Sequence, residues 1–177
     1  MSDLQCPATL LIARHGDAGY ANDGVLSDDG GWLTDVGRAQ VGELADTLRS
    51  RRISAVYSSR MEPAVESGEL AATELGVKAF AVDGLQELSA RPEAEDGHAV
   101  VSRVRDAVTA IADIHRGERV LVFTHSGVMA LVMPRIAASG CNTLAAQRFL
   151  PGCVAAEVEV DADGWRVVSW PDSSEEA

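Results

Sequence analysis

The chain has 177 residues, 46% of them hydrophobic and 24% charged, a length and balance typical of one compact globular domain rather than a disordered or fibrous protein. Its formal net charge of −12 argues against nucleic acids and anionic membranes as partners, because both bind concentrated Lys and Arg. No apolar run approaches 18 residues and the N-terminus has no basic leader, so we expect a cytoplasmic protein.

The first half of the chain predicts two strands, each followed by a helix. A continuous apolar run at 8–13 predicts a buried strand, and the apolar spacing of three and four residues after Thr34 predicts a helix from there to about residue 50. A second strand is expected at 53–58. A second helix should then run from Pro63 to about residue 75.

The same alternation continues with weaker signals. Residues 78–82 predict a third strand, and the acidic stretch 83–97 predicts an exposed loop. A helix at about 98–116 should lead into a buried strand at 119–124.

The last third of the chain predicts a helix followed by an antiparallel hairpin. Residues 128–138 predict a helix that Pro134 ends or kinks. Two further strands, 154–160 and 165–170, flank the turn sequence D-A-D-G and predict an antiparallel hairpin.

Strands that alternate with helices predict a three-layer α/β/α sandwich with a mostly parallel sheet and a C-terminal antiparallel hairpin. We expect one domain over residues 1–170. The acidic tail 171–177 is expected to be disordered.

Polar groups follow three of these strands: R-H-G at 14–16, S-S-R at 58–60 and T-H-S-G at 124–127. The carboxyl ends of parallel strands are where ligands bind in open α/β sheets. A single histidine at a strand end is usually structural, but His15 and His125 form a pair of such histidines, which favours a functional site.

This arrangement suits phosphoryl transfer. His15 would attack phosphorus while His125, as an imidazolium, neutralises the phosphate oxygens. Gly16 allows close approach of the backbone, and Ser126 opens a turn that can present N–H groups to the anion. Glu87 is the carboxylate we expect to protonate the leaving oxygen, although it also fits a merely acidic loop.

Four segments resemble the motifs of the histidine phosphatase superfamily, also called the phosphoglycerate mutase-like family: L-I-A-R-H-G at 11–16, L-T-D-V-G-R-A-Q at 33–40, L-Q-E at 85–87 and V-F-T-H-S-G at 122–127. The resemblance implies a phosphohistidine intermediate on His15. It also implies a phosphate pocket that includes Arg14 and His125, with no metal and no other cofactor.

Two departures from the family pattern affect the expected site. Pro63 stands where the family has its second phosphate-binding arginine, so we expect Arg60 to supply that charge, unless it is simply a surface residue. The segment after Glu87 is short and lacks the family's lid-forming pattern. An open pocket fits a phosphatase better than a mutase, which must protect its intermediate from water.

The expected function is therefore metal-independent hydrolysis of a small phosphomonoester, with that substrate as the main partner. Two alternatives stay open: a phosphohistidine protein phosphatase, and a catalytically silent phosphate-binding module. The sequence leaves the oligomeric state open, a homodimer included.

The remaining histidines and the cysteines are interpreted as surface or structural residues. His98 and His115 lie on one helix without a metal-ligand pattern, so both are expected at the surface. The three cysteines, Cys6, Cys141 and Cys153, are expected to be reduced and structural.

Overall fold

The computed structural model describes residues 6–20, 31–88, 95–136 and 151–170. Its centre is a six-stranded sheet in the order β5-β4-β6-β1-β7-β8. The first four strands of that order are mutually parallel, and the C-terminal hairpin joins antiparallel to β1. The strands are β1 (Ala8–Arg14), β4 (Ile53–Ser59), β5 (Lys78–Val82), β6 (Arg119–Thr124), β7 (Ala155–Asp161) and β8 (Gly164–Ser169).

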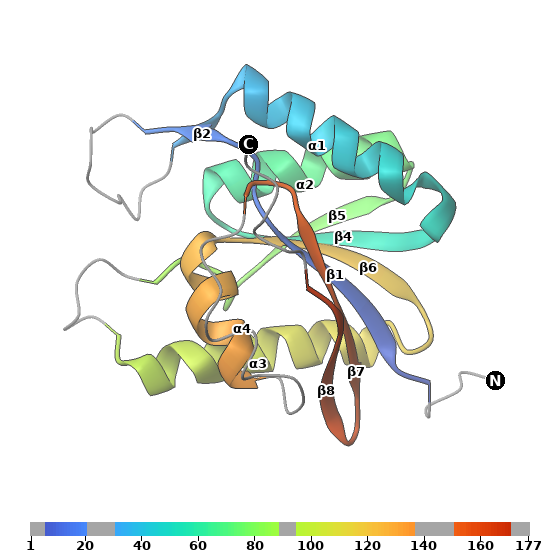
Figure 1. Ribbon diagram of the computed structural model, residues 1–177, viewed down its shortest axis with the longest axis vertical. Helices are drawn as coiled ribbons and strands as arrows, with labels where there is room; N and C mark the ends of the chain where they lie inside the picture. The colour runs from blue at the N-terminus through green and yellow to red at the C-terminus, as the bar shows by residue number, and fades with distance from the viewer. Residues whose placement is uncertain (1–5, 21–30, 89–94, 137–150, 171–177) are drawn as a thin grey trace.

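Helices cover both faces of this sheet (Figure 1). On one side lie α1 (Asp35–Leu48) and α2 (Glu62–Leu75), and on the other lie α3 (Gly97–Ile114) and α4 (Met133–Ile136). A separate apolar cluster fills each of the two layers. Because β1 and β6 are covered on both faces, their sequences are continuously apolar rather than alternating. The predicted three-layer sandwich is confirmed.

The helix ends follow the predicted local chemistry. Thr34 caps α1, because its Oγ1 accepts a hydrogen bond from the Gly37 N–H at 3.0 Å. A short 3-10 turn, Arg49–Arg51, follows that helix. Pro63 lies in the first turn of α2, where its missing N–H costs nothing, and Gly76 ends the helix with a φ of 69°.

The structure departs from the predicted elements in two places. The helical segment passes through Pro134 to Ile136, and its irregularity is a π-helical stretch, Val128–Val132, just before α4. A small two-stranded sheet, β2 (Ala18–Gly19) with β3 (Trp32–Leu33), was not predicted, since strands of two residues carry no periodic signal. Residues 137–138, Cys141, most of the segment expected to lack a lid and the tail 171–177 lie outside the described residues.

The expectation of a surface position is wrong for His115, whose side chain is only 12% exposed. Its Nε2 lies 2.9 Å from the Tyr57 hydroxyl and its Nδ1 2.7 Å from Glu118 Oε2. His115 directly follows the last residue of α3, and its ring packs edge-on against Tyr57 of β4 instead of facing solvent. His98, by contrast, is exposed as expected.

Among the described residues no helix combines the length and apolar character that crossing a membrane requires. In the same part of the chain, no group of three or more His, Cys, Asp or Glu side chains is arranged to hold a metal ion.

Candidate active site

The two strand-end histidines lie side by side. β1 and β6 are neighbouring parallel strands in which Arg14 pairs with Thr124, so the residues that follow them emerge together. The ring centroids of His15 and His125 are 5.1 Å apart and their planes meet at 64°. Each residue is only 3% exposed. The sheet register therefore creates the pair that the sequence suggested.

His15 is oriented by its own loop. Its Nδ1 lies 2.7 Å from the Gly16 carbonyl oxygen, so a proton on Nδ1 is donated to that carbonyl and Nε2 keeps its lone pair. Burial lowers the pKa of His15 and outweighs the Gly16 hydrogen bond, which raises it; the charge of Arg14 lowers it further. A neutral ring with a free Nε2 is the form that can act as a nucleophile at neutral pH.

His125 is the more perturbed of the two. Its Nε2 lies 2.7 Å from the Oγ of Ser59, at the end of β4, and the two share a hydrogen bond. Burial, followed by the charges of His15 and Arg14, lowers the pKa of His125 to about 3. A pKa this low leaves His125 neutral at neutral pH, which contradicts the expected imidazolium, because burial disfavours the charged ring.

This depressed pKa predicts an acid-sensitive fold. Between about pH 3 and 6.5 the unfolded chain protonates His125 and the folded chain does not, so stability is lost as the pH falls below 6.5. Urea unfolding at about pH 7.5 and about pH 5 should show a loss roughly 2 kcal/mol larger in the wild type than in His125→Asn. Equal losses in the two proteins would contradict a buried neutral His125.

Glu87 lies against the turn that follows His125. Its Oε2 accepts hydrogen bonds from Ser126 Oγ at 3.2 Å and from the Gly127 N–H at 3.0 Å. Its Oε1 accepts from the Leu88 N–H at 2.9 Å. Ser126 and the following N–H were expected to bind phosphate, but both donate to the Glu87 carboxyl group at the start of the helical segment.

The two arginines expected in the phosphate pocket differ sharply. Arg14 is half-buried, its Nε is buried without a hydrogen-bond partner in the described residues, and its charge lowers the pKa of both histidines. An unpaired donor beside the histidines suits an incoming anion. Arg60 instead forms an exposed ion pair with Asp83 at 2.8 Å, and its side chain is 59% exposed. The structure does not bring Arg60 to the histidines, because Asp83 holds it at the surface after β5.

The His15 loop is supported by residues to which the sequence assigned no part in the site. Gln40 Oε1 accepts the Asp17 N–H at 2.8 Å, and Thr34 Oγ1 donates to Asp17 Oδ2 at 2.7 Å. On the other side, Ser67 Oγ accepts the Gly16 N–H at 3.2 Å. Thr34 and Gln40 belong to the 33–40 motif of the sequence. Their contacts with Asp17 appear only in the folded structure, where α1 lies against the His15 loop.

Gly37 offers a test of this support. A Cβ at Gly37 would lie 2.2 Å from the Asp17 carbonyl oxygen, so Gly37→Ala must displace the backbone beside His15. We expect at least about a tenfold loss of activity and a destabilisation of roughly 1–3 kcal/mol, measured by steady-state kinetics and urea unfolding.

Gly42→Ala, on the same helix, is the matched control for that substitution. A Cβ there meets nothing within 4 Å. It should leave activity unchanged and raise the free energy of unfolding by roughly 0.5–1 kcal/mol. Equal activity of the two variants would contradict the role of α1 in supporting the loop.

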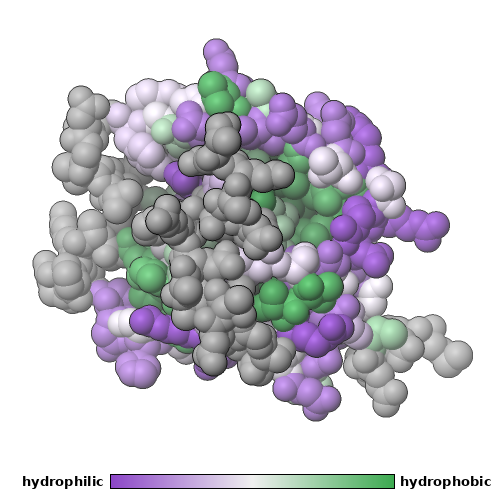
Figure 2. Space-filling model, in the orientation of Figure 1, coloured by the Kyte–Doolittle hydropathy of each residue, from purple (hydrophilic) through white to green (hydrophobic). Residues whose placement is uncertain are grey.

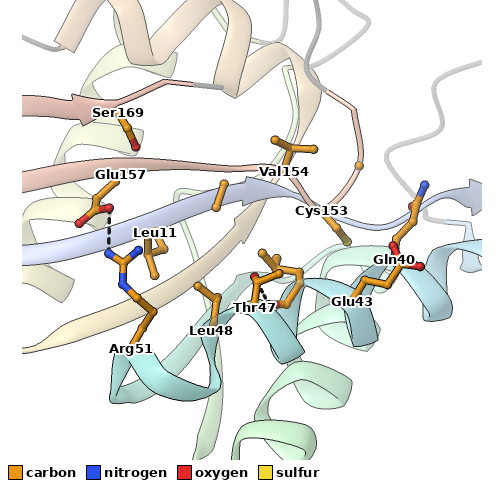
Figure 3. A pocket seen from close by; sticks show the side chains of 13 residues that line it. Leu11, Gln40, Glu43, Thr47, Leu48, Arg51, Cys153, Val154, Glu157 and Ser169 are labelled. Atoms are coloured by element: carbon orange, nitrogen blue, oxygen red, sulfur yellow. Dashed lines mark hydrogen bonds and ion pairs between the residues drawn. The ribbon is translucent and has the colours of Figure 1, made fainter. Parts of the chain in front are cut away.

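A separate groove of about 420 Å³ lies between α1 and β7, and neither histidine lines it (Figure 3). Hydrophobic atoms show there among a mostly hydrophilic described surface (Figure 2). At one end Arg51 pairs with Glu157 at 2.8 Å. Cys153 lines the groove, and burial raises the pKa of its thiol to about 12, which makes it a poor nucleophile.

Comparison with known proteins agrees with this geometry. The family model described as histidine phosphatase superfamily (branch 1) matches residues 10–92 and 89–173. The chain belongs to this superfamily. Phosphatase-type chemistry is therefore the activity class that its family indicates.

Individual proteins are similar to this chain over most of its length. Phosphoglycerate mutase-like protein 4 of Arabidopsis thaliana is 28% identical, over 94% of this chain and 86% of its own. The structure of Bacillus stearothermophilus YhfR has a TM-score of 0.79 at 22% identity, covering 94% of this chain and 98% of its own. The protein histidine phosphatase SixA, complexed with tungstate, has a TM-score of 0.68 at 20% identity, covering 92% and 94%. These two structures share the fold of this chain.

Proposed function

We propose that this protein is a metal-independent phosphatase that hydrolyses a small phosphomonoester through a phosphohistidine on His15. The observation that carries the proposal is the position of Glu87, bound to the turn that directly follows His125. Hydrolysis of an ester requires a proton for the departing alkoxide, and a carboxyl group next to the two histidines can supply it.

The reaction has two steps. In the first, His15 Nε2 forms a bond to phosphorus while the bond to the ester oxygen breaks and Glu87 gives that oxygen a proton. In the second, water attacks phosphorus, the N–P bond breaks, and Glu87 takes the proton from the water. Arg14 and His125 stabilise the phosphoryl oxygens, Arg14 through its unpaired Nε and His125 as an N–H donor.

Glu87 must exchange partners for this role. Its Oε2, which now accepts from Ser126 and Gly127, has to turn toward the leaving oxygen, and the two released donors then become available to the phosphoryl group. The expectation that Ser126 binds substrate thus remains part of the proposal, as a contact made after that exchange. Arg60 can join the pocket only by leaving Asp83.

A second candidate function is removal of phosphate from a histidine of another protein. The fold shared with SixA, which is a protein histidine phosphatase, favours it. Because imidazole is a better leaving group than an alkoxide, this reaction needs little help from Glu87. A third candidate, phosphate binding without catalysis, is motivated by Pro63 in place of the family's arginine.

One screen separates the three functions. Purified protein with a chelator present is offered metabolite phosphates, an aryl phosphate and a phosphohistidine protein, and quenched samples are analysed by intact mass and peptide mapping. Metal-independent turnover of an ester, with phosphate on His15, supports the proposal. Turnover of the phosphohistidine protein alone favours the second function, and binding without turnover favours the third.

A further inference from the structure

Arg103, on α3, binds the segment that carries Glu87 through both terminal nitrogens of its guanidinium group. Its Nη1 donates to the carbonyl oxygens of Gly84 at 2.9 Å and Gln86 at 2.8 Å, and its Nη2 donates to that of Glu87 at 3.2 Å. The same guanidinium binds both carboxylate oxygens of Glu95, at 2.6 and 2.9 Å. The side chain is only 22% exposed.

The segment needs such a partner because it has no regular structure of its own. Residues 83–88 follow β5 without joining a strand or helix, so their carbonyl groups have no ladder to pair with. Gly84, with a φ of 93°, also brings the backbone close to α3: a Cβ there would lie 2.8 Å from the Arg103 carbonyl oxygen. The backbone of the segment thus lies directly against α3 at Gly84.

The geometry points to Arg103 as a positioning residue for the general acid, an inference that rests on the proposed function. Arg103 holds the backbone carbonyl of Glu87 from α3, while Ser126 and Gly127 hold its carboxylate from the other side. The side chain touches neither histidine through a hydrogen bond in the described residues. Its charge lowers the pKa of His125, and its hydrogen bonds act on the reaction through the placement of the Glu87 carboxyl group.

Lysine cannot replace this group. A planar guanidinium can donate to the three carbonyl oxygens and the Glu95 carboxylate at once, whereas an ammonium group has only three donors on a single nitrogen. Glu95 keeps the guanidinium charge compensated in its half-buried position. Loss of Arg103 should therefore loosen the Glu87 segment rather than the histidine pair, which is held by β1 and β6.

The test compares two leaving groups. Arg103→Met and Arg103→Lys are assayed on 4-nitrophenyl phosphate, whose phenolate leaves without a proton, and on the alkyl phosphate with the highest wild-type turnover. We expect kcat to fall at least about 30-fold on the alkyl ester and less than about threefold on the aryl ester. Arg105→Met, an exposed residue of the same helix, should change neither value.

A double variant separates positioning from a general structural effect. If Arg103 acts through Glu87, then Arg103→Met should cause no further loss on the alkyl ester in a Glu87→Gln background. Hydrogen exchange should also show faster exchange of the Leu88 amide, which now binds Glu87 Oε1, while the amides of β1 and β6 keep their protection.

Equal losses on both esters, or additive losses in the double variant, would overturn the inference. If Arg103→Met does not fold, the same comparison is made with Arg103→Lys, which keeps the positive charge and loses the planar set of donors to the three carbonyl groups. Failure of the proposed function looks different: the wild type would then hydrolyse neither ester and carry no phosphate on His15.

Discussion

Replacing His15 with alanine is expected to lower turnover of every phosphate ester by at least about 10³-fold, because in the proposed mechanism His15 forms the covalent bond to phosphorus. The imidazole lies in a buried, preorganised position with Nδ1 tied to the Gly16 carbonyl oxygen, so water in the vacated space lacks both its nucleophilicity and its orientation. The measurements are steady-state kcat and the mass of quenched protein, which should show no added phosphate.

His98→Ala is the matched control for that substitution. This histidine is exposed at the start of α3 and takes no part in the proposed site. It should retain full activity and the phosphorylated species. Turnover that survives the loss of His15, with phosphate still attached to the protein, would assign the intermediate to another residue.

Replacing Glu87 with glutamine should separate substrates by their leaving groups. The amide keeps the size of the carboxyl group but cannot transfer a proton, so kcat on an alkyl phosphate is expected to fall about 10²- to 10⁴-fold. On 4-nitrophenyl phosphate the loss should stay below about tenfold, and a phosphohistidine protein should be almost unaffected. The measurement is kcat across a series of esters whose alcohols differ in pKa.

Glu69→Gln, an exposed carboxylate on α2, serves as the control for this series and should leave every rate unchanged. A uniform loss across leaving groups would mean that Glu87 supports the turn at Ser126 and Gly127 instead of moving a proton. A fully active variant on alkyl esters would remove Glu87 from the mechanism and favour the protein phosphohistidine reaction.

Much of the site was visible in the sequence because it depends on strand ends. A strand covered on both faces has a continuous apolar sequence, so the first polar residue after it marks the end of the strand clearly. His15 and His125 could therefore be predicted as a pair before the register of β1 and β6 placed their rings 5.1 Å apart. Glu87 was also predicted, from its place just after β5.

The contacts of loop side chains could not be predicted from the sequence in this way. Arg60 was expected in the phosphate pocket, but Asp83, distant from it in sequence, holds it at the surface. Ser126 was expected to face substrate, yet it donates to Glu87. These contacts depend on how distant segments pack against each other, and hydrophobic periodicity in the sequence does not predict that packing.

The sequence by itself thus determined the layer architecture and the two histidines, since both follow from local hydrophobic patterning. Only the tertiary structure decided the charge state of His125, whose pKa near 3 is a consequence of burial, and the attachment of the Glu87 segment to Arg103. Burial and long-range hydrogen bonds depend on which surfaces meet. That information exists only once the chain has folded.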